Sequence, residues 1–307
     1  MSLLVAIVGP TAVGKSALAL RLAQVFGGEI VNADSRQVYR LLDIGTAKPS
    51  QKDQQRVPHH LIDVVNPDQE FSLALYQQRA YEAIQGIHQR GRLPFLVGGS
   101  GLYIWTVVEG LRVPQVPPNW QRRRELESQA AANGGEALYH RLQEVDPKAA
   151  ARIDRRNLRR VIRALEVWET TGLPFSSLQH KMPPPFCSLI IGLTTERADL
   201  YRRIDERVDP MIQKGLVEEV RSLLARGYGL NLPALSGLGY RQIGRYLQGE
   251  LDLNEAVRQI KVETHRFARQ QYAWFRLKDP RIRWFDVRGD IEEDITQLIR
   301  DAKDEIR

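Results

Sequence analysis

The N-terminal segment constrains the fold more than any other feature of the chain. The apolar run LLVAIV, residues 3–8, is followed by GPTAVGKS, residues 9–16, and then by the periodic segment ALALRLAQVF. A short, continuous apolar run is typical of a strand that is buried on both faces of a parallel sheet. The pattern G-x-x-x-x-G-K-S between such a strand and a helix is typical of a loop that binds phosphate groups. We therefore predict a strand, a phosphate-binding loop and a helix, in that order.

The residue types in this loop explain why phosphate is the expected ligand. Its glycines let backbone N–H groups converge on phosphate oxygens at the N-terminus of the helix. Lys15 supplies a positive charge, and the Ser16 hydroxyl is placed to hold Mg²⁺. A glycine-rich turn with no ligand is the alternative, and the correct flanking segments on both sides disfavour it.

The rest of the chain predicts a doubly wound α/β fold with a parallel sheet. Further short strands are expected at residues 29–31, 94–97 and 187–193, and IRWFD, residues 282–286, reads as another. Helical periodicity covers residues 73–90, about 198–226 and about 253–277. Strands and helices that alternate at this spacing are typical of such a sheet.

Two proline clusters predict a second domain inserted into the first. VPQVPP begins at residue 113, and KMPPPF ends at residue 186. Proline clusters interrupt regular structure, so both are expected to act as hinges. The segment between them is helical in pattern and highly charged. We predict a discontinuous catalytic core, residues 1–112 and 187–307, and an α-helical insertion, residues 113–186.

Composition narrows the class of protein. A chain of 307 residues that is 43% hydrophobic can bury a sizeable core. Its single cysteine, Cys187, excludes an internal disulfide framework and a cysteine-based zinc site. The first apolar run is too short for a leader peptide or a membrane span. We expect a cytoplasmic protein with no membrane contact.

The phosphate loop lacks one partner that nucleotide hydrolysis requires. In ATP- and GTP-binding proteins with this loop, a carboxylate that follows a second apolar strand helps to hold Mg²⁺. Here the strand at residues 94–97 runs into Gly98-Gly99, with no acid. The sequence LID at residues 61–63 is a weak substitute. A diphosphate attached to another group would therefore fit the loop as well as a nucleotide.

Polar residues follow two of the other strands, at the edge where open α/β sheets bind ligands. Asp34 is expected to face the same crevice as Lys15, either as a Mg²⁺ ligand or as a general base, although a turn residue is also possible. Gln37 is suited to bidentate contact with an adenine edge, or it lies in a surface loop. Ser100 either contacts a phosphate or the acceptor, or it caps the next helix.

Positive charge is clustered in three places. Lysine and arginine exceed aspartate and glutamate by 44 to 37, which gives a net charge of +7. Two clusters lie in the insertion: Arg122–Arg124, and a set at helical spacing that consists of Arg152, Arg156, Arg159 and Arg163 and is flanked by Arg155 and Arg160. These favour contact with a nucleic-acid backbone over an ordinary charged surface. In the third cluster, HRFARQQYAWFR, arginines alternate with aromatic rings, as expected where RNA bases stack.

Taken together, the motifs resemble those of the bacterial tRNA dimethylallyltransferase family. In chain order they are GPTAVGKS, NADSRQVY, DIGTAKP, PHHLID, LVGGSGLY, RRVIRALEV, LGYRQ and ARQQYAWFR. They extend over most of the chain, and DIGTAKP and GGSGLY combined with the loop are far more specific than the loop alone. One departure is Ser236-Gly237-Leu238, which differs from the family at the start of the GYR motif.

The resemblance implies a reaction and its partners. A dimethylallyl group would pass from dimethylallyl diphosphate to N6 of the adenine immediately 3′ of a tRNA anticodon, with release of pyrophosphate. The loop would then hold a diphosphate, which accounts for the missing acid. The resemblance also implies Mg²⁺ with Ser16 as a ligand, and the tRNA anticodon stem-loop as the macromolecular partner. We expect a monomer.

The resemblance also assigns roles to individual residues. Asp34 would be the general base, and Lys15, Arg207 and Ser100 would be further catalytic groups. The diphosphate would be bound by Gly9, Pro10, Thr11, Ala12, Val13, Gly14, Lys15 and Ser16. The tRNA would be bound by Asp34, Ser35, Arg36, Gln37, Ser100, Arg123, Arg159, Arg160, Arg163, Gly239, Tyr240, Arg241, Arg269, Gln271 and Arg276.

Two other functions stay open at this point. A P-loop kinase of a small molecule would use Lys15, Ser16 and Asp34 but would not explain the basic clusters. A non-catalytic RNA-binding protein would explain the clusters, and Asp34 argues weakly against it.

Overall fold

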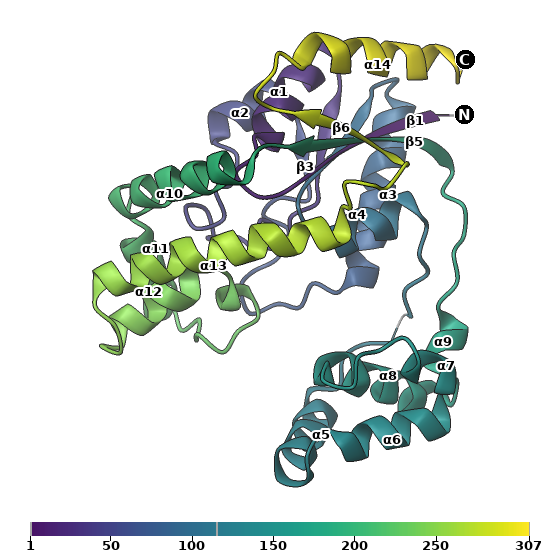
Figure 1. The fold of residues 1–307 in the computed structure, drawn as a ribbon, viewed down its shortest axis with the longest axis vertical. Helices are drawn as coiled ribbons and strands as arrows, with labels where there is room; N and C mark the ends of the chain where they lie inside the picture. Colours follow the sequence, from purple (N-terminus) through teal and green to yellow (C-terminus); the bar gives the residue numbers. More distant parts are fainter. Residues whose placement is uncertain (1, 115, 307) are drawn as a thin grey trace. The chain divides into compact units, whose positions relative to one another are not determined.

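The computed structural model describes residues 2–114 and 116–306. This part of the chain contains a six-stranded parallel sheet with the strand order β3-β2-β4-β1-β5-β6 (Figure 1). The strands are β1 (Ser2–Val8), β2 (Glu29–Asn32), β3 (His59–His60), β4 (Pro94–Val97), β5 (Phe186–Thr194) and β6 (Ile282–Asp286). The predicted α/β class with a phosphate-loop sheet is confirmed, while the two-residue strand β3 was not predicted.

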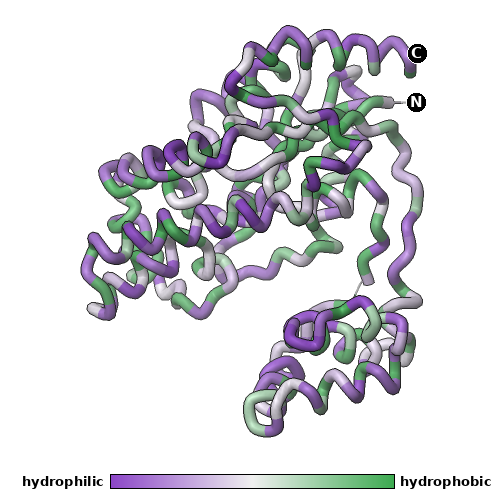
Figure 2. The backbone as a smooth tube through the Cα atoms, in the orientation of Figure 1, coloured by the Kyte–Doolittle hydropathy of each residue, from purple (hydrophilic) through white to green (hydrophobic). Residues whose placement is uncertain are grey.

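Helices cover both faces of the sheet because side chains alternate along each strand. Leu3, Val5 and Ile7 of β1 pack in one cluster with residues of α1 (Lys15–Phe26) and α14 (Glu292–Asp304). On the other face, α3 (Leu73–Gln89) and α4 (Gly101–Val108) contact β1, β2 and β4. The strands at the centre of the sheet are hydrophobic over most of their length, and hydropathy alternates along the helices (Figure 2).

The helices between β5 and β6 pack against one another, and we call this group of helices the arm. They are α10 (Arg197–Gln213), α11 (Leu216–Ala225), the short 3-10 turn η1 (Ala234–Ser236), α12 (Tyr240–Leu247) and α13 (Leu253–Trp274). The prediction of helix through residues 198–226 without a break is wrong. The helix is interrupted at Gly215, where φ is +99°. A backbone in that region disfavours continuation of a right-handed helix.

A second compact unit comprises Glu109–Pro183, and the first comprises Met1–Val108 and Pro184–Arg307. The second unit contains α5 (Trp120–Asn133), α6 (Glu136–Val145), α7 (Pro147–Ala150), α8 (Leu158–Thr171) and α9 (Phe175–Leu178). It has a hydrophobic core of its own, in which Leu126, Leu142 and Leu165 are fully buried. A short helix, α2 (Gln51–Arg56), completes the first unit and begins with a capping box at Ser50. Across the described residues, we find no helix with the length and apolar character that a membrane crossing requires.

Candidate active site

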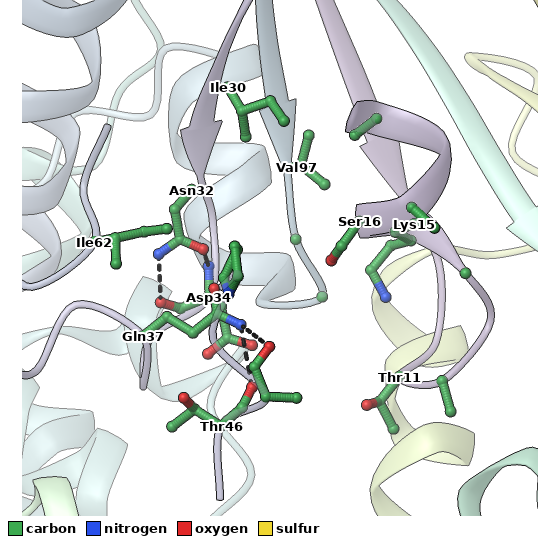
Figure 3. A pocket seen from close by; sticks show the side chains of 18 of the residues that line it. Thr11, Lys15, Ser16, Ile30, Asn32, Asp34, Gln37, Thr46, Ile62 and Val97 are labelled. Carbon is green, nitrogen blue, oxygen red and sulfur yellow. Dashed lines mark hydrogen bonds between the residues drawn. The ribbon is translucent and has the colours of Figure 1, made fainter. Parts of the chain in front are cut away.

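A pocket lies at the carboxyl ends of β1, β2 and β4, the edge at which open α/β sheets bind ligands. Its volume is about 310 Å³. The phosphate loop forms one wall, and the segment after β2 forms the opposite wall, so that Asp34 and Gln37 lie across the pocket from Thr11, Lys15 and Ser16 (Figure 3). The predicted site residues that line it are Thr11, Ala12, Gly14, Lys15, Ser16, Asp34, Gln37, Arg207 and Gln271.

The phosphate loop has the conformation that an anion site needs. Gly14 caps α1 in the left-handed region at φ +106°, and the helix begins at Lys15. The unpaired N–H groups of the first helical turn and the positive end of the helix dipole therefore face the pocket. This geometry suits a phosphate or diphosphate group.

Lys15 is held in the pocket by its own loop. Its Nζ donates a hydrogen bond to the carbonyl of Pro10 at 2.6 Å. Burial lowers the pKa of Lys15 to about 7, against an opposing effect of Asp34, and Arg207 lowers it further. A lysine with so low a pKa lacks a nearby anion that compensates its charge. A bound diphosphate would supply that anion.

Arg207 brings a second cation from a distant part of the chain. It lies on α10, lines the pocket, and its Nη1 donates to Thr11 Oγ1 at 3.3 Å. Burial lowers its pKa, although Asp34 opposes that effect. The pocket therefore holds two cations against one facing carboxylate, a charge balance that favours an anionic ligand.

The backbone around Asp34 is fixed by Asn32, the last residue of β2. Asn32 Oδ1 accepts the N–H of Asp34 at 3.1 Å, and its Nδ2 donates to the carbonyls of Asp34 and Leu61 at 3.1 and 2.9 Å. Asp34 Oδ1 accepts the N–H of Arg36 at 2.8 Å. Within the described residues its other carboxylate oxygen has no hydrogen-bond partner, so it is available to accept a proton from a bound group.

Gln37 is oriented by the loop that contains DIGTAKP. Its Nε2 donates to the carbonyl of Thr46 at 3.1 Å and to that of Ala47 at 3.4 Å (Figure 3). With the donor end of the amide engaged, Gln37 presents its oxygen as an acceptor. The bidentate contact with adenine considered from sequence needs one N–H of this amide, so at least one of these hydrogen bonds would have to break.

Several predicted residues lie outside the pocket and stabilise the loops around it. Ser100 directly precedes α4, but among the hydrogen bonds of the described residues its Oγ accepts the N–H of Ser35 at 3.0 Å rather than an N–H of the helix. Arg36 donates to the carbonyl of Pro233, and its Nη2 lies 3.1 Å from Ser236 Oγ. Ser35 is thus bound through its backbone and Arg36 through its guanidinium.

The predicted residues of the arm are also engaged within the fold. Tyr240, which follows Gly239, is 1% exposed, and its hydroxyl donates to Glu219 at 2.6 Å. Arg241 pairs with Glu263, and Arg269 donates to the hydroxyl of Tyr201. Arg241 and Arg269 are nevertheless exposed, as is Arg276, which lies just beyond the end of α13.

The basic face predicted for the insertion is partly wrong. Helix α8 begins only at Leu158, where the Asn157 side chain caps it, so Arg152 and Arg156 lie in the preceding turns rather than on the helix. Arg159 and Arg160 are exposed on its first turn. Sequence periodicity alone could not show that an Asx cap starts the helix at this point.

Two of the predicted tRNA contacts in the insertion form ion pairs inside their unit. Arg123 and Arg163 bind the carboxylate of Glu166 at 2.8 and 2.5 Å, and Glu166 is 1% exposed. Burial raises the pKa of Glu166, but the hydrogen bonds from Arg123 and Arg163 outweigh that effect and lower it. These two guanidiniums therefore stabilise the unit.

The pocket also contains residues to which no role was given from sequence. Asn32, Thr46, Ala47, His59 and Ile62 line it; Phe267, from the cluster of arginines and aromatic rings, does as well. The motifs DIGTAKP and PHHLID contain four of them, and that was the available signal. Their approach to the phosphate loop depends on tertiary packing of segments that are distant in sequence.

The donors for a divalent cation are few but suitable. Ser16 and Asp34 both line the pocket and offer oxygen ligands. Among the described residues there is no cluster of three or more His, Cys, Asp or Glu side chains arranged to hold a metal. Mg²⁺ is commonly bound by one or two protein oxygens together with substrate phosphates and water, so this donor set fits Mg²⁺ that arrives with a diphosphate.

Comparison with known proteins gives consistent matches along the chain. The family model described as IPP transferase matches residues 37–278, and that described as isopentenyl transferase matches residues 2–65. A tRNA dimethylallyltransferase of Roseiflexus castenholzii is 58% identical over 273 residues, 89% of each chain. One of Thermomicrobium roseum is 50% identical over 306 residues, 98% of this chain and 93% of the relative.

Solved structures agree with these matches. The tRNA isopentenylpyrophosphate transferase of Bacillus halodurans is similar, with a TM-score of 0.74 and 41% identity, over 99% of this chain and 97% of the other. A eukaryotic dimethylallyltransferase acting on tRNA has a TM-score of 0.81 at 27% identity, over 98% of this chain and 78% of the other.

Proposed function

The chain belongs to the tRNA dimethylallyltransferase family and is a prenyltransferase that modifies tRNA; we propose that its donor is dimethylallyl diphosphate and its acceptor N6 of the adenine 3′-adjacent to the anticodon. The observation that carries this proposal is the pocket itself, in which Lys15 lies across from Asp34 and Arg207 contacts Thr11 of the phosphate loop. A cationic cradle suits a leaving diphosphate, and a facing carboxylate suits an acceptor that must lose a proton. Family membership removes the support for the kinase and the non-catalytic alternatives.

Asp34 is the proposed general base. The exocyclic amine of adenine is a poor nucleophile because its lone pair is shared with the ring. As the N6–C bond forms, the amine must lose a proton, and the free carboxylate oxygen of Asp34 faces the pocket to accept it. A positioned base of this kind contributes on the order of 10²–10⁴ in rate.

The phosphate loop, Lys15 and Arg207 stabilise the leaving group. The C–O bond between the dimethylallyl carbon and the diphosphate breaks, and its electron pair leaves with the pyrophosphate. The negative charge that develops there is matched by the loop N–H groups and by two cations that are already in place. Mg²⁺, held by Ser16 and the diphosphate, would neutralise part of the same charge.

The tRNA must present its target base outside the helical stack of the anticodon loop, because the base has to enter a pocket between two loops. We assign the anticodon stem-loop to the arm and to the exposed arginines of the insertion. The enzyme is proposed to act as a monomer in the cytoplasm.

The experiment is a mass-spectrometric assay with purified protein, Mg²⁺, dimethylallyl diphosphate and unmodified tRNA. We expect one dimethylallyl group on the adenine 3′ of the anticodon. Lys15→Ala should abolish the product. Asp34→Ala should keep tRNA binding and lose at least about 10²-fold in turnover. Modification of another base, or near-normal turnover of Asp34→Ala, would contradict the proposal.

A further inference from the structure

Gln271 is a buried amide with both ends engaged. It lies near the end of α13, lines the pocket and is 3% exposed. Its Oε1 accepts the backbone N–H of Thr11 at 2.8 Å, and its Nε2 donates to the carbonyl of Gly99 at 3.0 Å. Buried side-chain amides of this kind are costly unless both ends are satisfied, and here both are.

The two partners of Gln271 belong to different walls of the pocket. Thr11 is part of the phosphate loop, and Gly99 is in the turn after β4. The contact with that turn is tight, because a Cβ atom at Gly99 would lie 2.2 Å from Gln271 Nε2. A side chain at position 99 would therefore push the amide away, and Gln271 and Gly99 form a matched pair.

The turn after β4 is also hydrogen-bonded to the segment that contains Asp34. The N–H of Ser100 donates to the carbonyl of Ala33 at 3.2 Å, and Ser100 Oγ accepts the N–H of Ser35 at 3.0 Å. Both neighbours of Asp34 are thus bound to the residue that follows Gly99. A continuous path of hydrogen bonds runs from the phosphate loop through Gln271 to the backbone on both sides of the base.

We propose that Gln271 is a positioning residue that fixes the spacing between the phosphate loop and the Asp34 segment. The inference rests on the proposed function and deepens it. Transfer requires the dimethylallyl carbon to lie between the leaving oxygen and N6, with the proton of N6 within reach of Asp34. A displacement of about 1 Å between these groups can lower the rate about 10²-fold. One rigid amide sets that distance, because it is bound to both walls.

This role replaces the tRNA contact expected for Gln271. Oε1 and Nε2 each have a partner within the fold, and the side chain is buried. Arg269, two residues earlier on the same helix, is exposed, and so is Arg276 beyond its end. A tRNA contact from this part of the chain is assigned to these two arginines, whereas Gln271 is buried.

The test compares Gln271→Met with Gln270→Met. The first removes both hydrogen bonds and keeps the size of the side chain, and the second is a matched control at an exposed position one residue away. We measure kcat with both substrates saturating, the Kd for tRNA and the thermal midpoint. Gln271→Met should lower kcat about 10- to 100-fold and leave the Kd for tRNA within about twofold. Gln270→Met should leave kcat at the wild-type value.

A second variant keeps the test decisive if the methionine destabilises the fold. Gln271→Glu can still accept the N–H of Thr11 but sets a carboxylate against the carbonyl of Gly99, so kcat should fall here as well. An unchanged kcat in a folded variant overturns the proposal, as does a weaker Kd for tRNA at normal kcat, which would restore the tRNA contact. The comparison is made relative to active wild-type enzyme, so failure of the wild type to modify tRNA would count against the proposed function instead.

Discussion

At the scale of single residues, the charge of Lys15 is the most sensitive property of the site. In the free chain its pKa is lowered to about 7, mainly by burial. Above that pH the free lysine is largely neutral. A bound diphosphate brings negative charge next to it, which favours the charged form and raises the pKa again. Binding above pH 7 should therefore be accompanied by uptake of a proton by Lys15.

This uptake can be measured by titration calorimetry with pyrophosphate at pH 8, in buffers that differ in ionisation enthalpy. Lys15→Arg is the control, because an arginine stays charged in both states. At pH 8 the wild type should bind as much as one proton more than the variant when pyrophosphate binds, and this difference should vanish near pH 5.5. Subtraction of the variant removes the proton exchange of pyrophosphate itself. Equal uptake by both proteins at pH 8 would contradict the lowered pKa.

The sequence identified the charged and hydroxyl-bearing residues of the site better than the other residues that line the pocket. Lys15 and Ser16 follow from the loop pattern and Asp34 from its place after a strand, while Arg207 was assigned only through the family resemblance. All four line one pocket. Residues such as Thr46 and Ile62 could not be found in this way, because no local pattern shows which loop packs against the phosphate loop. Gln271 was assigned to tRNA only through the family resemblance.

At the scale of elements, α11 supports the loop that contains DIGTAKP. Glu219 Oε2 accepts the N–H groups of Asp43 and Ile44 at 3.1 and 2.8 Å, and its Oε1 accepts that of Gly45 at 3.3 Å. The hydroxyl of Tyr240 donates to the same carboxylate. One side chain thus satisfies three successive backbone donors, just before the residues whose carbonyls orient Gln37.

Glu219→Gln should destabilise this loop and the fold, because an amide can satisfy fewer of these donors and places its own N–H₂ against one of them. Hydrogen bonds to a charged group contribute about 1.5–3 kcal/mol each, so we expect a loss of at least about 2 kcal/mol in the free energy of unfolding. Urea unfolding measures it. The neighbouring Glu218→Gln is the control, since Glu218 is exposed and pairs only with Arg221 among the described residues; it should change stability by less than about 0.5 kcal/mol. Equal effects of the two substitutions would show that Glu219 does not stabilise the loop.

Element positions were predicted well where a buried apolar run or a long amphipathic stretch defines them. The strand expected at residues 94–97 is β4, and the helix expected at residues 73–90 differs from α3 by one residue. Prediction failed where a single residue sets the end or the start of a helix. Gly215 interrupts the helix expected there, and Asn157 caps α8. The hydrophobic periodicity of the sequence continues through such positions, but the helical conformation of the backbone does not.

At the scale of the whole molecule, the arginines of the insertion include two groups with different roles. Arg122, Arg123, Arg141 and Arg163 form ion pairs with the carboxylates of Glu166 and Glu169. Arg159 and Arg160 are exposed, and among the described residues no hydrogen bond or ion pair is made by either guanidinium. From sequence, Arg163 was placed on the same basic face as Arg159, because the sequence does not show which cations a buried carboxylate binds. Unlike the first group, the second is available to tRNA phosphates, as are the exposed Arg124 and Arg152.

The last prediction separates these groups. Arg159→Ala combined with Arg160→Ala should weaken tRNA binding and reduce the slope of log Kd against log salt by about one unit for each lost phosphate contact. The thermal midpoint should stay within about 1 °C of the wild type, since exposed positions contribute little to stability.

Arg163→Ala should have the reverse effects on stability and on tRNA binding. It leaves a carboxylate that is 1% exposed with one guanidinium fewer, so the midpoint should fall by several degrees while the salt slope stays the same. A salt slope that changes in Arg163→Ala but not in the double variant would assign the phosphate contacts to the paired arginines, and the ion pairs with Glu166 would then have to open when tRNA binds.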